Sequence, residues 1–304
     1  MFIALLAGCG TQHADDAPPA PPAGAASALP ERVALSDLPE APVRGLAKGL
    51  TLPLDRYATG PVDAFAWQVA VQEQWRSCMA RYGFQDFGPP PVSVEATVTQ
   101  ANVAAGRRYG ISDLESAKKY GYHLPDDIPE APHWEPAPGA ESDVFTGAGT
   151  EVEGGSYKGK AVPSGGCRGE ARRMFPVPQT PEAQKLGTVA FDASRKDPVV
   201  TEAVAKWSSC MKKKGYDHTH PLEDLDKFGI SLSSSAAGPE EIAHAVADVE
   251  CKANTSLIKA WNAEESREQE SIIKQNAQKL TDEKSVKDTN ALKARQAYEK
   301  AAKR

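Results

Sequence analysis

The sequence contains no run of about 18 consecutive apolar residues, the length that a transmembrane helix needs. It also contains no basic stripe, because its 35 lysines and arginines are interspersed with 41 aspartates and glutamates, for a net charge of −6. Nucleic-acid binding depends on clustered positive charge. We therefore expect neither a membrane-spanning segment nor a nucleic-acid partner.

The short motifs of common enzymes are absent as well. The sequence has no G-x-S-x-G, H-E-x-x-H, P-loop or G-x-G-x-x-G. It also lacks the alternation of strand-like and helix-like segments that is typical of α/β enzymes. No two cysteines are close enough to form a C-x-x-C. We expect a non-enzymatic protein with no catalytic residue and no cofactor.

Proline and glycine are abundant but unevenly placed. Many of the 24 residues of each type crowd into residues 17–31, 88–92 and 128–166, and neither type occurs after Pro239. At 304 residues the chain is long enough for one large or two small domains. This distribution predicts compact helical parts joined by looser connectors.

The N-terminus predicts a lipid anchor. Residues 2–7 are apolar and run into Leu6-Ala7-Gly8-Cys9, which fits the lipobox of bacterial lipoproteins. In that family the cysteine is diacylglycerated and the signal is cut before it, so Cys9 would be lipidated and become the first mature residue. Only eight residues precede Cys9, without Lys or Arg, so we expect residues 1–9 to be a truncated lipoprotein signal. The alternative is a chance Leu-Ala-Gly-Cys in a buried N-terminal strand.

Residues 10–58 are expected to form a flexible tether. Residues 10–31 are rich in Ala, Pro, Gly and Ser and cannot build a core. Such a composition suits a flexible or extended connection between a membrane and a folded domain. The predicted location is the extracytoplasmic face of the cell membrane.

A repeated unit is the most specific internal signal. Trp75-Arg76-Ser77-Cys78-Met79 with Gly83-Phe84 reappears 132 residues later as Trp207-Ser208-Ser209-Cys210-Met211 with Gly215-Tyr216. A second match follows, where Tyr109-Gly110-Ile111-Ser112 corresponds to Phe228-Gly229-Ile230-Ser231. We therefore predict two helical repeats, over residues 59–180 and 181–262.

A further cysteine closes each repeat, Cys167 in the first and Cys251 in the second. The first repeat is longer by a stretch rich in Gly and Pro, residues 125–163, which we expect to be a long surface loop. Four cysteines allow three pairings. Because each repeat holds two, and export would favour oxidation, we expect the disulfides Cys78–Cys167 and Cys210–Cys251. A functional thiol or a metal site is the alternative.

Apolar residues at three- and four-residue steps place each W-x-S-C-M sequence near the end of a helix, with its tryptophan and methionine in the core. Gly83 and Gly215 supply the left-handed position that commonly ends a helix. Residues 263–304 are dominated by Glu, Lys, Gln and Ala. They predict a long C-terminal helix, broken near Thr281–Asp288, with a solvated face. The alternative is a helix that binds a partner.

With a Cys-Met-x-x-x-Gly-aromatic helix end and a later Gly-Cys-x-x-Glu-Ala segment at Gly166–Ala171, the chain resembles a group of secreted actinobacterial lipoproteins without an assigned activity. The resemblance covers roughly residues 60–262 and implies disulfides but no activity. The predicted fold is mainly α: two disulfide-stapled helical repeats with a long loop insertion and a long C-terminal helix.

Two stretches could carry chemistry. Asp217-His218-Thr219-His220, with Glu223 and Asp224, could hold zinc or copper through His218 and His220, although polar residues are also expected after a helix stop. Tyr120-Gly121-Tyr122-His123 with His133-Trp134 could line a glycan or peptide groove, or pack around the insertion.

Together these features favour a lipid-anchored extracytoplasmic surface protein, a non-enzymatic binding or envelope-associated module. Its expected partners are the membrane, through Cys9, and a cell-envelope protein or glycan. One alternative is a cell-wall-directed hydrolase that uses acids and histidines, with His123, His133, His218 and His220 as the candidates. The other is a metal-binding lipoprotein that uses His218 and His220.

Overall fold

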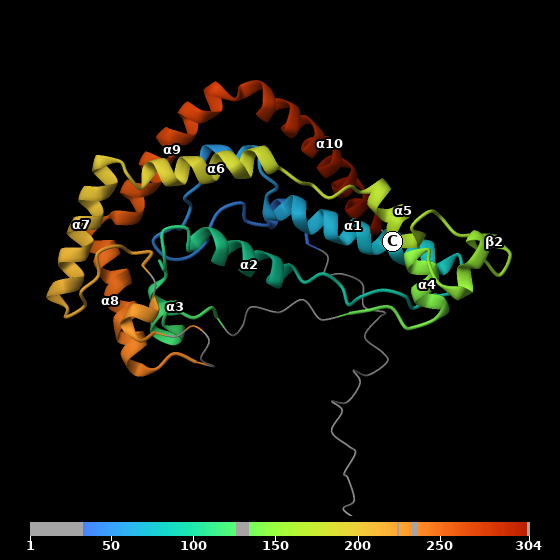
Figure 1. Ribbon diagram of the computed structural model, residues 1–304, viewed down its shortest axis with the longest axis horizontal. Coiled ribbons are helices and arrows are strands. Elements are labelled where there is room, and N and C mark those ends of the chain that lie inside the picture. Colours follow the sequence, from blue (N-terminus) through green and yellow to red (C-terminus); the bar gives the residue numbers. More distant parts are fainter. Residues whose placement is uncertain (1–32, 126–133, 224, 231, 233–235, 303–304) are drawn as a thin grey trace, which may run out of the picture.

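The computed structural model describes residues 33–125, 134–223, 225–230, 232 and 236–302, and it is mainly helical, as the sequence predicts (Figure 1). The α-helices are α1 (Pro61–Ala80), α2 (Val94–Gly106), α3 (Leu114–Tyr120), α4 (Ala140–Thr146), α5 (Gly166–Met174), α6 (Pro181–Ser194), α7 (Pro198–Lys213), α8 (Pro239–Thr255), α9 (Leu257–Gln275) and α10 (Ala277–Ala302). The short elements are the 3-10 helices η2 (Leu35–Asp37), η3 (Pro53–Arg56), η4 (Thr150–Gly155) and η5 (Leu225–Phe228), and the antiparallel strands β1 (Ser156–Tyr157) and β2 (Lys160–Ala161). Among these described elements, no helix combines the length and hydrophobicity that crossing a bilayer requires.

The repeated Cys-Met-x-x-x-Gly-aromatic motif forms the same helix end in both copies. After α1, Gly83 lies at φ 97°. Its N–H donates to Ala80 O at 3.1 Å, and the following N–H donates to Met79 O at 3.2 Å. The same two bonds end α7, where Gly215 lies at φ 92°. This pair of bonds is the Schellman motif, in which the left-handed position favours glycine. Helix termination therefore explains the spacing of the motif.

Both repeats are closed by a disulfide bond. Cys78 of α1 is bonded to Cys167 of α5, and Cys210 of α7 is bonded to Cys251 of α8, with Cα–Cα distances of 5.6 and 5.7 Å. Three of these cysteines, Cys78, Cys167 and Cys251, are fully buried. Each disulfide therefore ties the motif helix to the helix that closes its repeat, inside a hydrophobic cluster.

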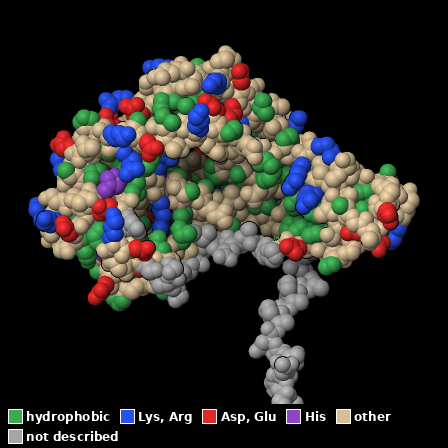
Figure 2. Space-filling view, in the orientation of Figure 1, with side chains coloured by type: hydrophobic (Ala, Val, Ile, Leu, Met, Phe, Trp, Pro, Cys, Tyr) green, Lys and Arg blue, Asp and Glu red, His purple; other side chains and the backbone are tan. Residues whose placement is uncertain are grey.

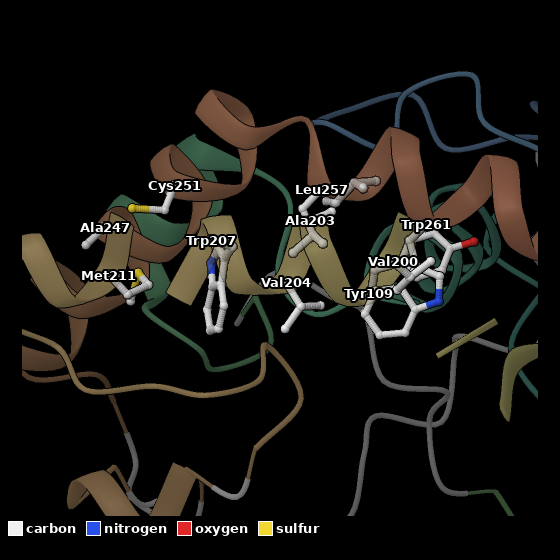
Figure 3. Close-up of a cluster of buried hydrophobic side chains, with 11 residues drawn as sticks. Tyr109, Val200, Ala203, Val204, Trp207, Met211, Ala247, Cys251, Leu257 and Trp261 are labelled. Atoms are coloured by element: carbon white, nitrogen blue, oxygen red, sulfur yellow. The ribbon is translucent and has the colours of Figure 1, made fainter. Parts of the chain in front are cut away.

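The two repeats share their core. Ile111 of the first repeat packs in one hydrophobic cluster with Ile230, its counterpart in the second, and α3 lies against α8. Tyr109 joins the cluster of α7 and α9, where Figure 3 shows it beside Val200 and Trp261. The boundary between residues 180 and 181 therefore does not separate two independent hydrophobic cores.

The charged C-terminal stretch forms part of a helix pair. The break between α9 and α10 lies at Asn276, before the predicted Thr281–Asp288. From there α10 runs back along α1 (Figure 1). The ring of Tyr298 meets that of Phe65 edge-on, with centroids 5.5 Å apart. One face of α10 is therefore covered by the chain itself, while side chains such as Val286 remain exposed.

Residues 33–58 pack on the body, so the prediction of a flexible tether over residues 10–58 is wrong for this part. Leu38 and Leu54 are buried, and the N–H of Leu54 donates to Gln269 Oε1 of α9 at 2.8 Å. Leucines spaced through residues 33–58 supply apolar surface that residues 10–31 lack. Residues 1–32, which include Cys9, lie outside the described residues.

The insertion, predicted as a surface loop over residues 125–163, is structured in its described part. Residues 134–163 contain α4, η4 and the β1–β2 hairpin. Four of their side chains are buried around the Cys78–Cys167 bond: Val144, Phe145, Val152 and Tyr157. The prediction fails because apolar residues between the glycines and prolines pack against the end of α1 and the disulfide.

Candidate functional site: the central cavity

A cavity of about 520 Å³ lies where α2, α6 and α9 meet the segment of residues 42–58. Figure 2 shows this face of the molecule hollowed in the region between α6 and α2. The walls are mostly apolar, from Leu50, Leu52, Leu54, Ala104, Ala105, Ala183 and Phe191, among others. They also carry polar side chains: Thr51, Asp55, Arg108, Tyr109, Gln184, Thr188, Asn262 and Gln269. Cavities of this size and character commonly hold small molecules. We call it the central cavity and treat it as the candidate site.

A buried ion pair supports one wall of the central cavity. Glu265 of α9 is fully buried, and Arg108 donates from Nε to Glu265 Oε2 at 2.8 Å and bonds Oε1 through Nη2. The hydroxyl of Tyr109 donates to Oε2 at 2.9 Å, and Gln269 Nε2 donates to Oε1 at 2.9 Å. A buried carboxylate requires such pairing. Arg108, Tyr109 and Gln269 all line the cavity, so this network sets their positions.

Arg108 and Tyr109 of this network also contact aromatic side chains of α6 and α9. Arg108 places its guanidinium over the ring of Phe191 on α6, with Cζ 5.2 Å from the centroid. The ring of Tyr109 lies 5.2 Å from that of Trp261. Burial, followed by the charge of Glu265, raises the pKa of Tyr109 far above its usual range. Tyr109 therefore remains a neutral donor, committed to Glu265.

Asp55 of η3 stands at the mouth of the central cavity. Its Oδ2 accepts the N–H of Leu52 at 2.7 Å, and its Oδ1 has no partner within the described part of the chain. Asp55 also lines two neighbouring cavities of about 370 and 430 Å³. Although the side chain is accessible, these concave walls reduce its hydration, and that loss raises the pKa of Asp55 against the opposing effect of the Leu52 hydrogen bond. Asp55 thus presents one free carboxylate oxygen to the site.

The predicted metal pair is split between two environments. His218 Nε2 contacts Nε2 of His244, and its Nδ1 lies 3.4 Å from Glu223 Oε2. His220 instead meets the ring of Trp261 edge-on, with centroids 5.7 Å apart. Across the described ranges, no group of three or more His, Cys, Asp or Glu is arranged to hold a metal. The geometry therefore gives the His218 and His220 prediction no support.

His218 and His244 belong to a buried aromatic cluster between α7 and α8. Tyr216 stacks on His244 with centroids 4.1 Å apart, and Phe228 lies 3.7 Å from the ring of His218. Burial lowers the pKa of both histidines, and that of His244 falls to about 4, with the charge of His218 as the second cause. Both rings are neutral at pH 7, so one Nε2 donates and the other accepts.

The second aromatic stretch does not form one groove in its described part. Tyr122 packs against Ile230 and Val249, and His123 Nδ1 lies 2.9 Å from Glu241 Oε1. Trp134 belongs to the separate cluster around Cys78–Cys167. His133, which the groove prediction includes, lies outside the described residues, and so does Asp224, which the metal-site prediction includes.

A second buried polar network joins the repeats. Asp248 of α8 accepts Trp207 Nε1 at 2.8 Å and Lys252 Nζ at 3.0 Å. Lys252 also donates to Ile111 O, in the first repeat, at 2.9 Å. Burial lowers the pKa of Lys252, while the charge of Asp248 opposes that effect. Because these polar atoms satisfy one another, we interpret this network as structural.

Sequence reasoning missed Asp55, Arg108 and Glu265. Arg108 directly precedes the repeated Tyr109-Gly110-Ile111-Ser112, but nothing in that motif marks its neighbour. Glu265 lies in the stretch predicted to be a solvated charged helix. Only long-range packing brings Arg108 and Glu265 together across 157 positions.

Comparison of the chain with protein-family models, with curated proteins and with solved structures gave no match.

Proposed function

We propose that this protein is a lipid-anchored extracytoplasmic surface protein that binds a small ligand in the central cavity without transforming it. The lipobox at Cys9 would attach the chain to the membrane. The helical body would then present the cavity to the cell envelope.

The two disulfides support the extracytoplasmic part of the proposal. Such bonds form and persist mainly in oxidising compartments. Both cystines lie in hydrophobic clusters, and each ties the motif helix of a repeat to the helix that closes it. They belong to the core, which favours a protein that folds outside the reducing cytoplasm.

The structure of the central cavity supports the ligand-binding part of the proposal. Its lining comes from the N-terminal segment, α2, α6 and α9, which the buried Glu265 network holds together. The titratable side chains in its lining are Asp55, Arg108 and Tyr109, and the last two are engaged with Glu265. Covalent catalysis would instead favour a nucleophile beside a general base. Preformed, mostly apolar walls with polar groups at fixed positions favour ligand binding.

The test of this proposal uses the gene at its chromosomal position, so that any codons upstream of Met1 are kept. Wild-type protein should sediment with membranes and be degraded by protease added to intact cells. Cys9→Ser should leave the membrane fraction but keep both disulfides, as non-reducing electrophoresis would show. Recovery of both proteins in the cytoplasm with free thiols would overturn the proposal.

A further inference from the structure

The charged side chains around the central cavity are unequally paired. In the central cavity and the adjoining 370 Å³ cavity, the lining includes two basic residues, Arg56 and Arg108, and two acidic residues, Asp55 and Glu40. Arg108 is bonded to Glu265. Arg56 lies 3.9 Å from Glu270. Both cations are therefore matched by acids outside the lining.

The two lining acids have no such match. Within the described residues, neither Asp55 nor Glu40 forms an ion pair, and Asp55 uses only Oδ2, for the N–H of Leu52. The charge of Arg108 acts on Asp55 without direct contact and opposes the rise in its pKa. Pairing of both arginines leaves an excess of negative charge at the mouth of the cavity. An anionic ligand would be repelled there, whereas a cation at Asp55 would gain a direct contact to Oδ1, which no group in the described part of the chain makes.

The walls beyond Asp55 restrict the rest of the ligand. Ala104 and Ala105 of α2 face the cavity together with leucines of the N-terminal segment and Phe191 of α6. Gly187 of α6 lies in this wall, and a Cβ added there would approach only Leu54 Cδ1, at 4.0 Å. An apolar body could therefore be buried while the charged end remains at Asp55.

From these contacts we infer that the central cavity binds a small amphipathic organic cation, a primary ammonium on an aliphatic body, with the ammonium at Asp55 and the aliphatic part between α2 and α6. The inference deepens the binding part of the proposed function and rests on it. Asp55 Oδ1 accepts from the ammonium, and Arg108, whose guanidinium is bonded to Glu265, forms part of the wall.

The probes are three molecules of one length: hexylammonium, hexanol and hexanoate. Titration calorimetry of the full chain near pH 7.5 and low salt should show saturable binding of hexylammonium at one site. Hexanol should bind at least tenfold more weakly, because it keeps only the apolar contact, and hexanoate should not bind. Raised salt should weaken hexylammonium binding. Tighter binding of hexanoate, or no binding of hexylammonium at millimolar concentration, would overturn the inference.

Two variants locate the site. Asp55→Asn keeps an acceptor for the N–H of Leu52 and should weaken hexylammonium binding at least tenfold. Gly187→Leu fills the wall, favours the helix, and should weaken hexylammonium and hexanol alike. The control is Asp217→Asn, which removes a carboxylate whose side chain is 87% exposed, and it should bind like wild type. Equal affinity of Asp55→Asn and wild type, with thermal unfolding showing both folded, would contradict the assignment.

The results separate this inference from the proposed function. Membrane-anchored protein that binds none of the probes would overturn the cation site alone. Protein that binds hexylammonium but remains in the cytoplasm with free thiols would overturn the exported, anchored function alone.

Discussion

Trp207 donates its indole N–H to Asp248 Oδ1 at 2.8 Å, in the core of the second repeat. In the first repeat the matching tryptophan, Trp75, has a buried Nε1 with no acceptor among the described residues. When the closing cysteines are aligned, the position of Asp248 is occupied by Ser164. The repeats therefore share their helix ends and disulfides but differ in their buried polar contacts.

This difference predicts unequal costs for the same substitution. Trp207→Phe should lower the free energy of unfolding by about 2–3 kcal/mol, because it removes a hydrogen bond to a buried carboxylate as well as ring atoms. Trp75→Phe should cost about 1 kcal/mol, since it removes ring atoms and an unsatisfied donor. Urea unfolding followed by circular dichroism measures both values. Equal losses, or a larger loss for Trp75→Phe, would contradict the assignment of the bond.

The carboxylate of Glu265 should be essential to stability. Glu265→Gln would leave Arg108 without its partner, and we expect a loss of about 3 kcal/mol. On the same helix, Glu270→Gln removes only the exposed contact to Arg56 and should cost less than about 0.5 kcal/mol. The comparison uses guanidinium chloride unfolding of both variants. A loss for Glu265→Gln as small as that for Glu270→Gln would mean that the network does not hold the cavity together.

Acid should destabilise the fold partly through His244. Burial lowers its pKa in the folded protein to about 4, below the usual value of about 6.5. Between these values the unfolded chain binds more protons, so the contribution of His244 is complete above pH 6.5 and is lost as the pH falls toward 4. The loss is at most about 3 kcal/mol.

The matched variant is His244→Phe, which keeps a ring beside Tyr216 but cannot titrate. Urea unfolding from pH 7.5 to 4 should show a smaller pH slope for the variant than for wild type, with other groups titrating in both. Parallel curves would exclude His244 as a source of the acid sensitivity.

The two disulfides should stabilise the body by similar amounts. They span 89 and 41 residues of sequence. The loop-entropy estimate gives about 4–5 kcal/mol for Cys78–Cys167 and about 4 kcal/mol for Cys210–Cys251. Double alanine variants at each pair, compared by chemical unfolding without reductant, measure these values. A loss below about 1 kcal/mol for either pair would show that packing alone holds that repeat together.

Local features could be predicted from the sequence where the chemistry is local. The glycine at position 215 marks a helix end, and the apolar period places Trp207 and Met211 in the core, where both are buried. The repeat also predicts which cysteine partners which, and both bonds are present. These inferences need only the φ preference of glycine, helical periodicity and the count of cysteines.

Long-range features could not be predicted from such patterns. The tether prediction extends the polar, Pro-rich character of residues 10–31 as far as residue 58, and the composition of residues 263–304 predicts a solvated helix. Leu54 and Glu265 are nevertheless buried, because distant helices cover them. From the sequence of α9 alone, the carboxylate of Glu265 looks exposed. In the fold it is buried and bonded to Arg108, which comes from a distant part of the chain. The cavity arises from this assembly, so no single motif contains it.

The most direct test of the central claim is the intact mass of the mature protein, isolated from the membrane of its native host and measured before and after reduction. The proposal of an anchored protein with two disulfides predicts a lipid-modified terminus at Cys9 and a gain of four hydrogens on reduction, two for each disulfide. An unmodified Met1 terminus with an unchanged mass on reduction would contradict it.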